Sequence, residues 1–344
     1  MPSLLSKIIL VFLPLFFWPN PLKFELPKVI LFLTLSFFLI IWFLLKGGFD
    51  KVENKTWFFW VGILLLSTVL NNRFLPGLIG DGYRHQGVIF FLVLGFWMIA
   101  FSQLENLKKI WWWISLAVIG ESLIVLGRPI GTFGEPNAAA GFLVMGLPIL
   151  AKVSLPFVIL STGAILATSS KAGLGALLAQ GLIFGYLKIK SFPGKKFLTI
   201  LGLIIILLVG IFGVWQEKNI SPFENRWLIW NLGIRAVLEK PVLGYGAEGI
   251  ISVYEKQYKN IDRSLEELVV DRSHNLFLDI ALSSGFLGLL VFLKWLWESI
   301  REIKEDWKFV ALAGFLIFSF FQPIGVVHWV YLAFLISAYS GTQR

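Results

Sequence analysis

Two residues in the C-terminal half of the chain, His274 and Arg226, are of types that could move a proton and bind a phosphate. His274 precedes Asn275 and an apolar segment that we expect to be helical. Because a helix N-terminus disfavours an imidazolium, His274 should stay neutral and able to take a proton from a hydroxyl, with Asp271 or Arg272 near enough to orient it. Arg226 is expected among apolar residues of a helix, where a lone guanidinium is costly without a partner or an anionic ligand. The alternatives are a structural His at the start of a helix and an Arg that snorkels to an interface.

Four further polar residues fall in short segments between apolar stretches. Glu135 and Asn137 belong to a turn rich in Gly and Pro and could contact a sugar, although a plain turn has the same composition. Lys171 follows three hydroxyl residues at a helix start, so it could hold a phosphate oxygen or simply snorkel. Arg84 lies in a polar loop and is a second candidate for binding an anion.

The composition predicts a membrane protein. Of 344 residues, 57% are hydrophobic and only 15% are charged, against roughly 25% charged in soluble domains. The apolar residues form runs long enough to cross a hydrocarbon core. Basic residues alternate between short loops and form no stripe, so the net charge of +9 does not indicate a nucleic-acid partner. We therefore expect an all-α polytopic protein and exclude soluble enzymes and nucleic-acid binders.

Hydropathy and turn residues predict about twelve spans in a single multi-pass domain, residues 1–344. A retained first span is expected, since no small-residue cleavage site follows it. A longer loop, about residues 216–274, interrupts the pattern and should contain short helices. Ser221, Pro222 and Glu224 predict a helix start, and that helix should run to about Lys240. The expected spans are about 5–18, 28–45, 57–70, 88–103, 110–127, 139–152, 156–168, 172–187, 197–215, 275–297, 308–321 and 329–341.

The distribution of Lys and Arg predicts the orientation of these spans. Lys-rich loops should be cytoplasmic, which places both termini in the cytoplasm and loop 216–274 on the outer side. Seven of the nine Arg residues then face outward, against the usual bias. Because Arg binds phosphate and carboxylate in bidentate fashion, we expect an anion to be handled on the outer side.

The sequence gives no indication of a metal or another cofactor. The chain has no Cys, and its three His residues lie far apart without metal-ligand spacing. Glu121 is an ionisable residue inside the fifth expected span, where such groups have a polar partner or a function. His328 is expected at the membrane interface.

Taken together and in order, several short motifs resemble the O-antigen ligase and O-antigen polymerase superfamily over residues 70–295. Their residues are Arg84-x-x-Gly87, Gly131-x-Phe133-Gly134-x-Pro136-Asn137, Thr168-Ser169-Ser170-Lys171, Arg226-x-x-x-Trp230, Pro241-x-x-Gly244-x-Gly246 and His274-Asn275-x-x-Leu278 followed by Gly285-x-x-Gly288.

This resemblance implies a metal-independent glycosyltransferase of the C-type membrane superfamily, in the cytoplasmic membrane with its active site facing the periplasm or the outside. Such enzymes take a glycan from an undecaprenyl-diphosphate carrier and transfer it to a hydroxyl of lipid A-core or of another repeat unit. Arg226 would grip the diphosphate and His274 would be the catalytic His. Lys171 stands where the family usually has Arg, which keeps the charge but loses the bidentate fork.

Arg84 and Lys171 would be further phosphate contacts, and Glu135, Asn137, Asn275 and Arg272 further substrate contacts. The expected partners are the lipid-linked donor, a lipid or glycan acceptor and membrane lipids. A polymerase of the same fold is the nearest alternative. A flippase or transporter of lipid-linked glycans is less favoured, because the polar residues gather in the outer loops rather than deep in several spans.

Overall fold

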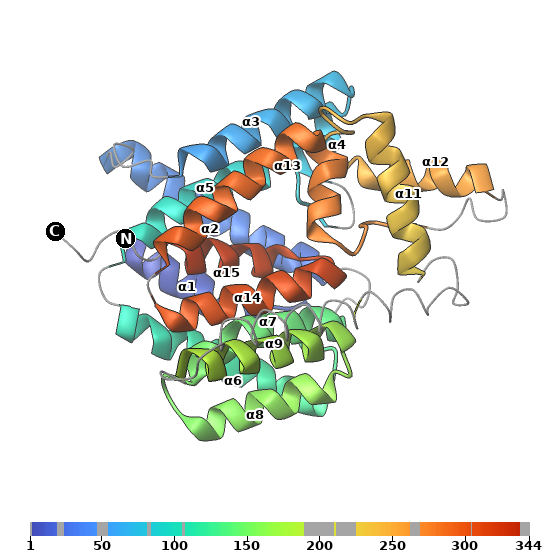
Figure 1. Cartoon of the computed structure of the whole chain (residues 1–344). Coiled ribbons are helices and arrows are strands. Elements are labelled where there is room, and N and C mark those ends of the chain that lie inside the picture. Colours follow the sequence, from blue (N-terminus) through green and yellow to red (C-terminus); the bar gives the residue numbers. More distant parts are fainter. Residues whose placement is uncertain are drawn as a thin grey trace.

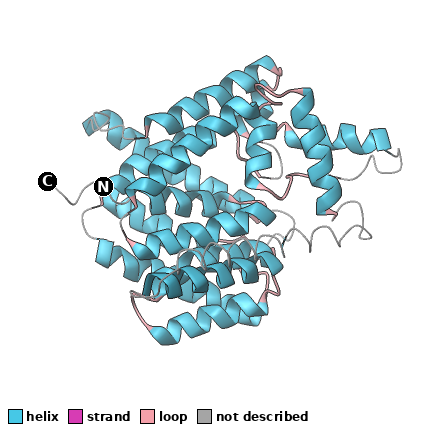
Figure 2. Ribbon diagram, in the orientation of Figure 1, coloured by secondary structure: helices cyan, strands magenta, loops and turns pink. Residues whose placement is uncertain are grey.

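The computed structural model describes residues 2–18, 24–46, 54–80, 84–104, 107–188, 210, 225–261, 269–303 and 305–337. Within these ranges every regular element is a helix (Figures 1 and 2). The expected all-α class therefore holds for the part of the chain that the structure describes.

Eleven of the twelve expected spans overlap apolar helices, and the ninth, 197–215, falls almost wholly outside the described residues. Three helices are long and apolar enough to cross a membrane by length and composition: α2, the Ile110–Gly127 part of α6, and α13. The count of twelve membrane spans stays a prediction. The overlapping helices are α1 (Pro2–Leu15), α2 (Glu25–Lys46), α3 (Lys55–Leu70), α5 (Val88–Ser102), α6 (Leu107–Gly127), α7 (Pro136–Leu150), α8 (Leu155–Ala167), α9 (Lys171–Lys188), α13 (Leu276–Glu302), α14 (Asp306–Phe321) and α15 (Val326–Ser337).

Two helices of the long loop, α11 (Arg226–Glu239) and α12 (Ile250–Ile261), lie at one end of the bundle beside the short α4 (Phe74–Ile79) (Figure 1). The expected start of α11 at Pro222 is wrong. The described helix begins after Asn225, which has an extended backbone conformation. The Asn225 side chain accepts a hydrogen bond from the Leu228 amide at 3.0 Å and so caps the helix. The expected cap, Ser221, lies outside the described residues.

Helix α13 is not the continuous span that the hydropathy predicts, because it breaks at Gly285, where φ is 67° and ψ is −173°. The 241–246 turn, which connects α11 to α12, occupies the break and forms the main-chain hydrogen bonds that the helix loses. Such replacement is what allows irregular backbone at membrane depth. The amides of Phe286 and Leu287 donate to the carbonyls of Pro241 (2.7 Å) and Val242 (3.3 Å), and those of Tyr245 and Gly246 donate to Leu282 (2.7 Å) and Ser283 (3.0 Å).

The C-terminal end of α3 holds the 241–246 turn from a third side. The Ser67 hydroxyl donates to the carbonyl oxygens of Leu243 and Ser283, and Asn71 donates to the Gly244 carbonyl at 3.1 Å. One hydroxyl therefore bonds both the turn and the broken helix.

Glu121, whose partner the sequence does not reveal, accepts two hydrogen bonds from Thr132, one from its amide and one from its hydroxyl, each of 2.9 Å. The buried Lys28 ammonium donates to the same hydroxyl at 3.4 Å and to the Pro14 carbonyl at 2.9 Å. This arrangement ties the Gly-rich turn before α7 to α1, α2 and α6.

The expectation that His328 is interfacial is wrong, because its ring is fully buried. Nδ1 accepts a hydrogen bond from the Gly325 amide at 3.2 Å, so Nε2 carries the proton and donates to the Ala138 carbonyl at 3.0 Å. His328 thus connects the start of α15 to α7, and both ring nitrogens are used inside the protein.

We predict that Gly285→Ala lowers the free energy of unfolding by about 3 kcal/mol, because its φ and ψ are nearly exclusive to glycine. A Cβ there would also overlap the Val242 carbonyl oxygen. Thermal unfolding of purified protein in detergent measures the change. The control is Gly62→Ala in α3, where a Cβ meets nothing within 4 Å. Equal stability of the two variants would contradict the assigned backbone break.

Candidate functional site

The candidate site lies where α11, the segment before α13 and the end of α14 meet. His274 has a positive φ of 56° and directly precedes Asn275, the N-cap of α13. Its neighbour Ser273 is held on both sides: the Ser273 amide donates to Asp279 at 2.7 Å, and its carbonyl accepts from the Trp230 indole at 3.0 Å. The Trp230 contact also fixes α11, and with it Arg226, against the segment that carries His274.

Burial of the imidazole lowers the pKa of His274 to about 4, and the charge of Arg226 is the second cause of this shift. The Asp271 carboxylate and the Gln322 side chain act in the opposite direction but do not offset this. The neutral state agrees with the sequence-based expectation, although burial rather than the helix end is its main cause. Nδ1 of His274 is buried and has no hydrogen-bond partner among the described residues. An unsatisfied buried nitrogen is uncommon in folded proteins and requires an explanation, of which a catalytic role is one.

Arg84 lies beside this site, and Asp271 is its partner. Arg84 Nε and a carboxylate oxygen of Asp271 are 2.5 Å apart. Burial opposes the charge on Arg84, but Asp271, Glu25 and Glu135 together raise the pKa of Arg84 above its ordinary value. Burial likewise opposes ionisation of Asp271, but Arg84 lowers the pKa of this carboxyl below its usual range. Asp271 is therefore an ionised partner of Arg84, and within the described part of the chain it forms no hydrogen bond with His274.

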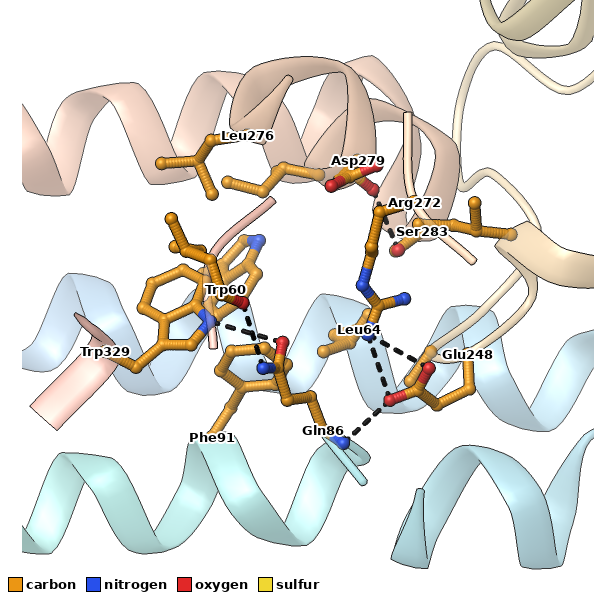
Figure 3. Close-up of a pocket in the computed structure, with 14 residues that line it drawn as sticks. Trp60, Leu64, Gln86, Phe91, Glu248, Arg272, Leu276, Asp279, Ser283 and Trp329 are labelled. Atoms are coloured by element: carbon orange, nitrogen blue, oxygen red, sulfur yellow. Dashed lines mark hydrogen bonds and ion pairs between the residues drawn. The ribbon is translucent and has the colours of Figure 1, made fainter. Parts of the chain in front are cut away.

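Arg272, a predicted substrate contact, instead forms a buried ion pair with Glu248 (Figure 3). Its Nη2 lies 3.1 and 3.0 Å from the two carboxylate oxygens, and the main-chain N–H of Gln86 donates to the same carboxylate at 2.7 Å. The Gln86 side chain continues the chain of contacts, since Trp329 donates to it at 3.3 Å. Glu248 thereby joins the loop before α5 to the segment that carries His274.

The ion pair borders a small cavity of about 40 Å³ next to α13 (Figure 3). Asp279 and Ser283 line it on one side and two tryptophans, Trp60 and Trp329, on the other. This volume suits a few water molecules and is too small for a sugar.

Two predicted substrate residues come together at the start of α7 and α9. The Asn137 amide donates to Glu135 at 2.9 Å and accepts from the Ser170 hydroxyl at 2.7 Å. Two of the motifs, separated by about thirty residues, therefore share one hydrogen-bond chain. Lys171 is the exposed first residue of α9, next to Ser170.

Asn275, which we expected to contact substrate, has a structural role at the start of α13. Its side-chain oxygen accepts a hydrogen bond from the Leu278 amide at 3.0 Å and so caps α13. The structure thus brings His274, Arg226 and Arg84 together, while the side chains of Arg84, Asn275 and Arg272 are bonded within the protein.

Sequence reasoning missed Glu248 and Gln322. Gln322 directly follows α14 and interacts with His274. Glu248 has a positive φ of 54° and a fully buried side chain. One signal pointed to it: a carboxylate between glycines in an otherwise apolar segment needs a partner if the segment is buried. No comparable signal marks Gln322.

Among the described residues, no group of three or more His, Cys, Asp or Glu could hold a metal ion.

Comparison with known proteins finds a family that resembles part of this chain. The family model described as O-antigen ligase matches residues 156–293, which include Lys171, Arg226 and His274. Over these residues the chain is similar to the O-antigen ligase family. The motif resemblance seen in the sequence is thereby confirmed.

Two curated relatives carry names that fit the superfamily. The ComP-specific O-oligosaccharyltransferase of Acinetobacter baylyi is 24% identical over 352 aligned positions, covering 85% of this chain and 62% of the relative. A candidate polysaccharide ligase of Rickettsia conorii is 28% identical over 111 positions, covering 30% of this chain and 27% of that protein. The chain thus spans less than two thirds of the length of either superfamily relative.

We predict that Glu248→Ala lowers the free energy of unfolding by about 3–5 kcal/mol, because it leaves the buried Arg272 charge without its carboxylate. Thermal unfolding followed by tryptophan fluorescence measures the loss. The control is the exposed Glu255→Ala on α12, for which we expect a change within about 0.5 kcal/mol. A Glu248→Ala protein as stable as this control would show that the ion pair contributes nothing.

Proposed function

We propose that the protein is a glycosyltransferase that moves a glycan from an undecaprenyl-diphosphate carrier to an acceptor hydroxyl, on the outer side of the cytoplasmic membrane. The single observation that carries this proposal is a neutral, partly exposed His274 beside the charge of Arg226. The match to the O-antigen ligase family model and the two ligase-type relatives support glycan transfer as the reaction class.

The proposed reaction is one displacement at the anomeric carbon of the glycan. The acceptor hydroxyl attacks this carbon while its proton passes to the His274 imidazole, and the bond between the carbon and the diphosphate oxygen breaks. The diphosphate leaves with the bonding electrons, and Arg226 stabilises its growing negative charge. Arg84 and Lys171 are proposed as further contacts of the diphosphate. An inverting outcome follows from a single displacement.

The low pKa of His274 fits this role for an electrostatic reason. The cations that should hold a diphosphate also disfavour a second positive charge on the imidazole. Together with burial, this keeps His274 unprotonated at neutral pH and ready to take the acceptor's proton. We propose that the reaction needs no metal, with Arg226 supplying the charge stabilisation.

We predict that His274→Gln lowers transfer activity by about 10²–10⁴-fold, the usual contribution of a general base. Arg226→Ala should lower it by about 10²–10³-fold through lost charge stabilisation. The control is Arg235→Ala, which removes an exposed Arg from the same helix and should leave activity unchanged.

The assay for these variants uses the purified chain in liposomes, undecaprenyl-diphosphate glycan and a panel of acceptors: lipid A-core, a second repeat unit and a peptide. It is run with EDTA and with added Mg²⁺. Loss of donor with a new glycosylated product identifies a transferase, and the accepted substrate separates a ligase from a polymerase. An intact donor that changes leaflet equally in all variants would overturn the proposal in favour of a transporter, and dependence on Mg²⁺ would overturn metal independence.

The pH dependence gives a separate prediction. Since protonation removes the base, kcat/KM should stay level as pH falls from 7 to 5 and decline only as pH falls through about 4. A His with its ordinary pKa would instead give a decline centred near about 6.5. A decline of kcat/KM centred near that higher pH would show that burial and Arg226 do not keep His274 neutral in the free enzyme.

A further inference from the structure

A second and larger cleft lies between α7, α8, α9 and α14, at the end of the bundle away from His274. Helix α14 shows the separation: it ends at Phe321, next to Gln322 and the candidate site, whereas its first residue, Asp306, lines the cleft sixteen positions earlier. The cleft has a volume of about 470 Å³, within the usual range for small-molecule sites. Its walls are mainly apolar and include Leu155, Val158, Leu177, Phe184 and Trp307.

A buried amide holds three of these helices in fixed positions. Gln180 of α9 donates from Nε2 to the carbonyl oxygens of Val144 in α7 (2.8 Å) and Val310 in α14 (3.3 Å). The positions of α7, α9 and α14 around the cleft are therefore fixed by hydrogen bonds as well as by packing. On its α9 wall, Gly181 leaves room: a Cβ added there would meet nothing within 4 Å.

Two opposite charges line this cleft, Lys152 in the turn after α7 and Asp306 at the start of α14. Both are exposed, and neither forms an ion pair with any described residue, including the other. Each charge alone suits the helix end where it lies, a cation after the C-terminus of α7 and an acid in the first turn of α14. Together, at one apolar cleft, they provide a cation and an anion for the same ligand.

The apolar walls cannot select a lipid by themselves, because lipid tails are as apolar as the side chains they would contact. Selection must come from the two charges. A phosphate fits Lys152, and a primary ammonium, with N–H groups to donate, fits the Asp306 carboxylate. Phosphatidylethanolamine carries both groups, whereas phosphatidylglycerol lacks the cation and phosphatidylcholine has a cation without an N–H.

We propose that this cleft binds one phosphatidylethanolamine molecule, with an acyl chain between α8 and α9 and the headgroup between Lys152 and Asp306. The inference does not depend on the glycan transfer proposed above, because it concerns the other end of the bundle and a different ligand.

Native mass spectrometry of the purified full chain tests the headgroup. Detergent-solubilised protein is titrated with phosphatidylethanolamine, phosphatidylglycerol and phosphatidylcholine of identical acyl chains. We expect one phosphatidylethanolamine bound on the order of tenfold more tightly than the other two, the value of one charge-assisted hydrogen bond. Asp306→Ala should remove this preference, and Lys152→Ala should weaken the binding of all three lipids, because each of them carries a phosphate. Equal binding of the three lipids, a preference that persists in Asp306→Ala, or unchanged binding by Lys152→Ala would overturn the proposal.

A pair of glycine variants tests the chain-binding part of the cleft. Gly181→Leu should fill the space and abolish phosphatidylethanolamine binding. Gly185→Leu is the matched control, since Gly185 lies one turn further along α9, also has open space at its Cβ and is not part of the cleft lining. Both variants should keep wild-type thermal stability. Equal lipid binding by the two variants would overturn the assignment.

A phosphatidylethanolamine with a photoreactive acyl chain locates the bound lipid. Labelled peptides should come from residues 147–187 and 306–310. Labelling that is confined to other segments would overturn the proposal. In a second experiment, a photoreactive amino acid replaces Gly181. A crosslink from it to residues 197–215 of the same chain, in place of lipid, would favour a protein occupant.

Discussion

The structure depends on one constraint, that peptide groups released at a helix break must find new partners inside the protein. At Gly285 two carbonyl groups before the break and two amides after it are paired with the 241–246 turn. This pairing positions the first part of α13, and His274 and Asn275 immediately precede that helix. Gly244 and Gly246, with φ of 66° and 84°, allow the turn to approach so closely. A motif of one proline and two glycines therefore acts on the site through main-chain geometry, without contributing a side chain to the chemistry.

Ion pairs neutralise two of the cations around the site. Arg272 is neutralised by Glu248 and Arg84 by Asp271, so both help to hold the fold around the site. The charge that most affects His274 is that of Arg226, from a different helix. Trp230, four residues later on the same helix face, fixes that helix against Ser273. One turn of α11 therefore supplies both the charge and the contact that positions it.

Much of the fold was predictable, because apolar runs determine helices in this chain whatever their partners are. The break in α13 was not, since residues 276–302 are apolar on both sides of Gly285 and only the distant turn explains it. The start of α11 was misplaced because two capping signals, Ser221 and Asn225, lie four residues apart and sequence alone cannot rank them. His274 and Arg226 were identifiable from residue type and motif. Glu248 and Gln322 contact the site only through tertiary packing, which no local pattern encodes.

The Ser67 hydroxyl bonds carbonyl oxygens that lie 176 and 216 residues further along the chain. During synthesis, the end of α3 must therefore wait for most of the protein to emerge before it meets its partners. Local helices can form and insert early, whereas closing such a long loop is slow and entropically costly. The site around His274 should consequently be among the last parts of the molecule to assemble, so a chain interrupted before the second half of α13 would contain the motif residues without their working arrangement.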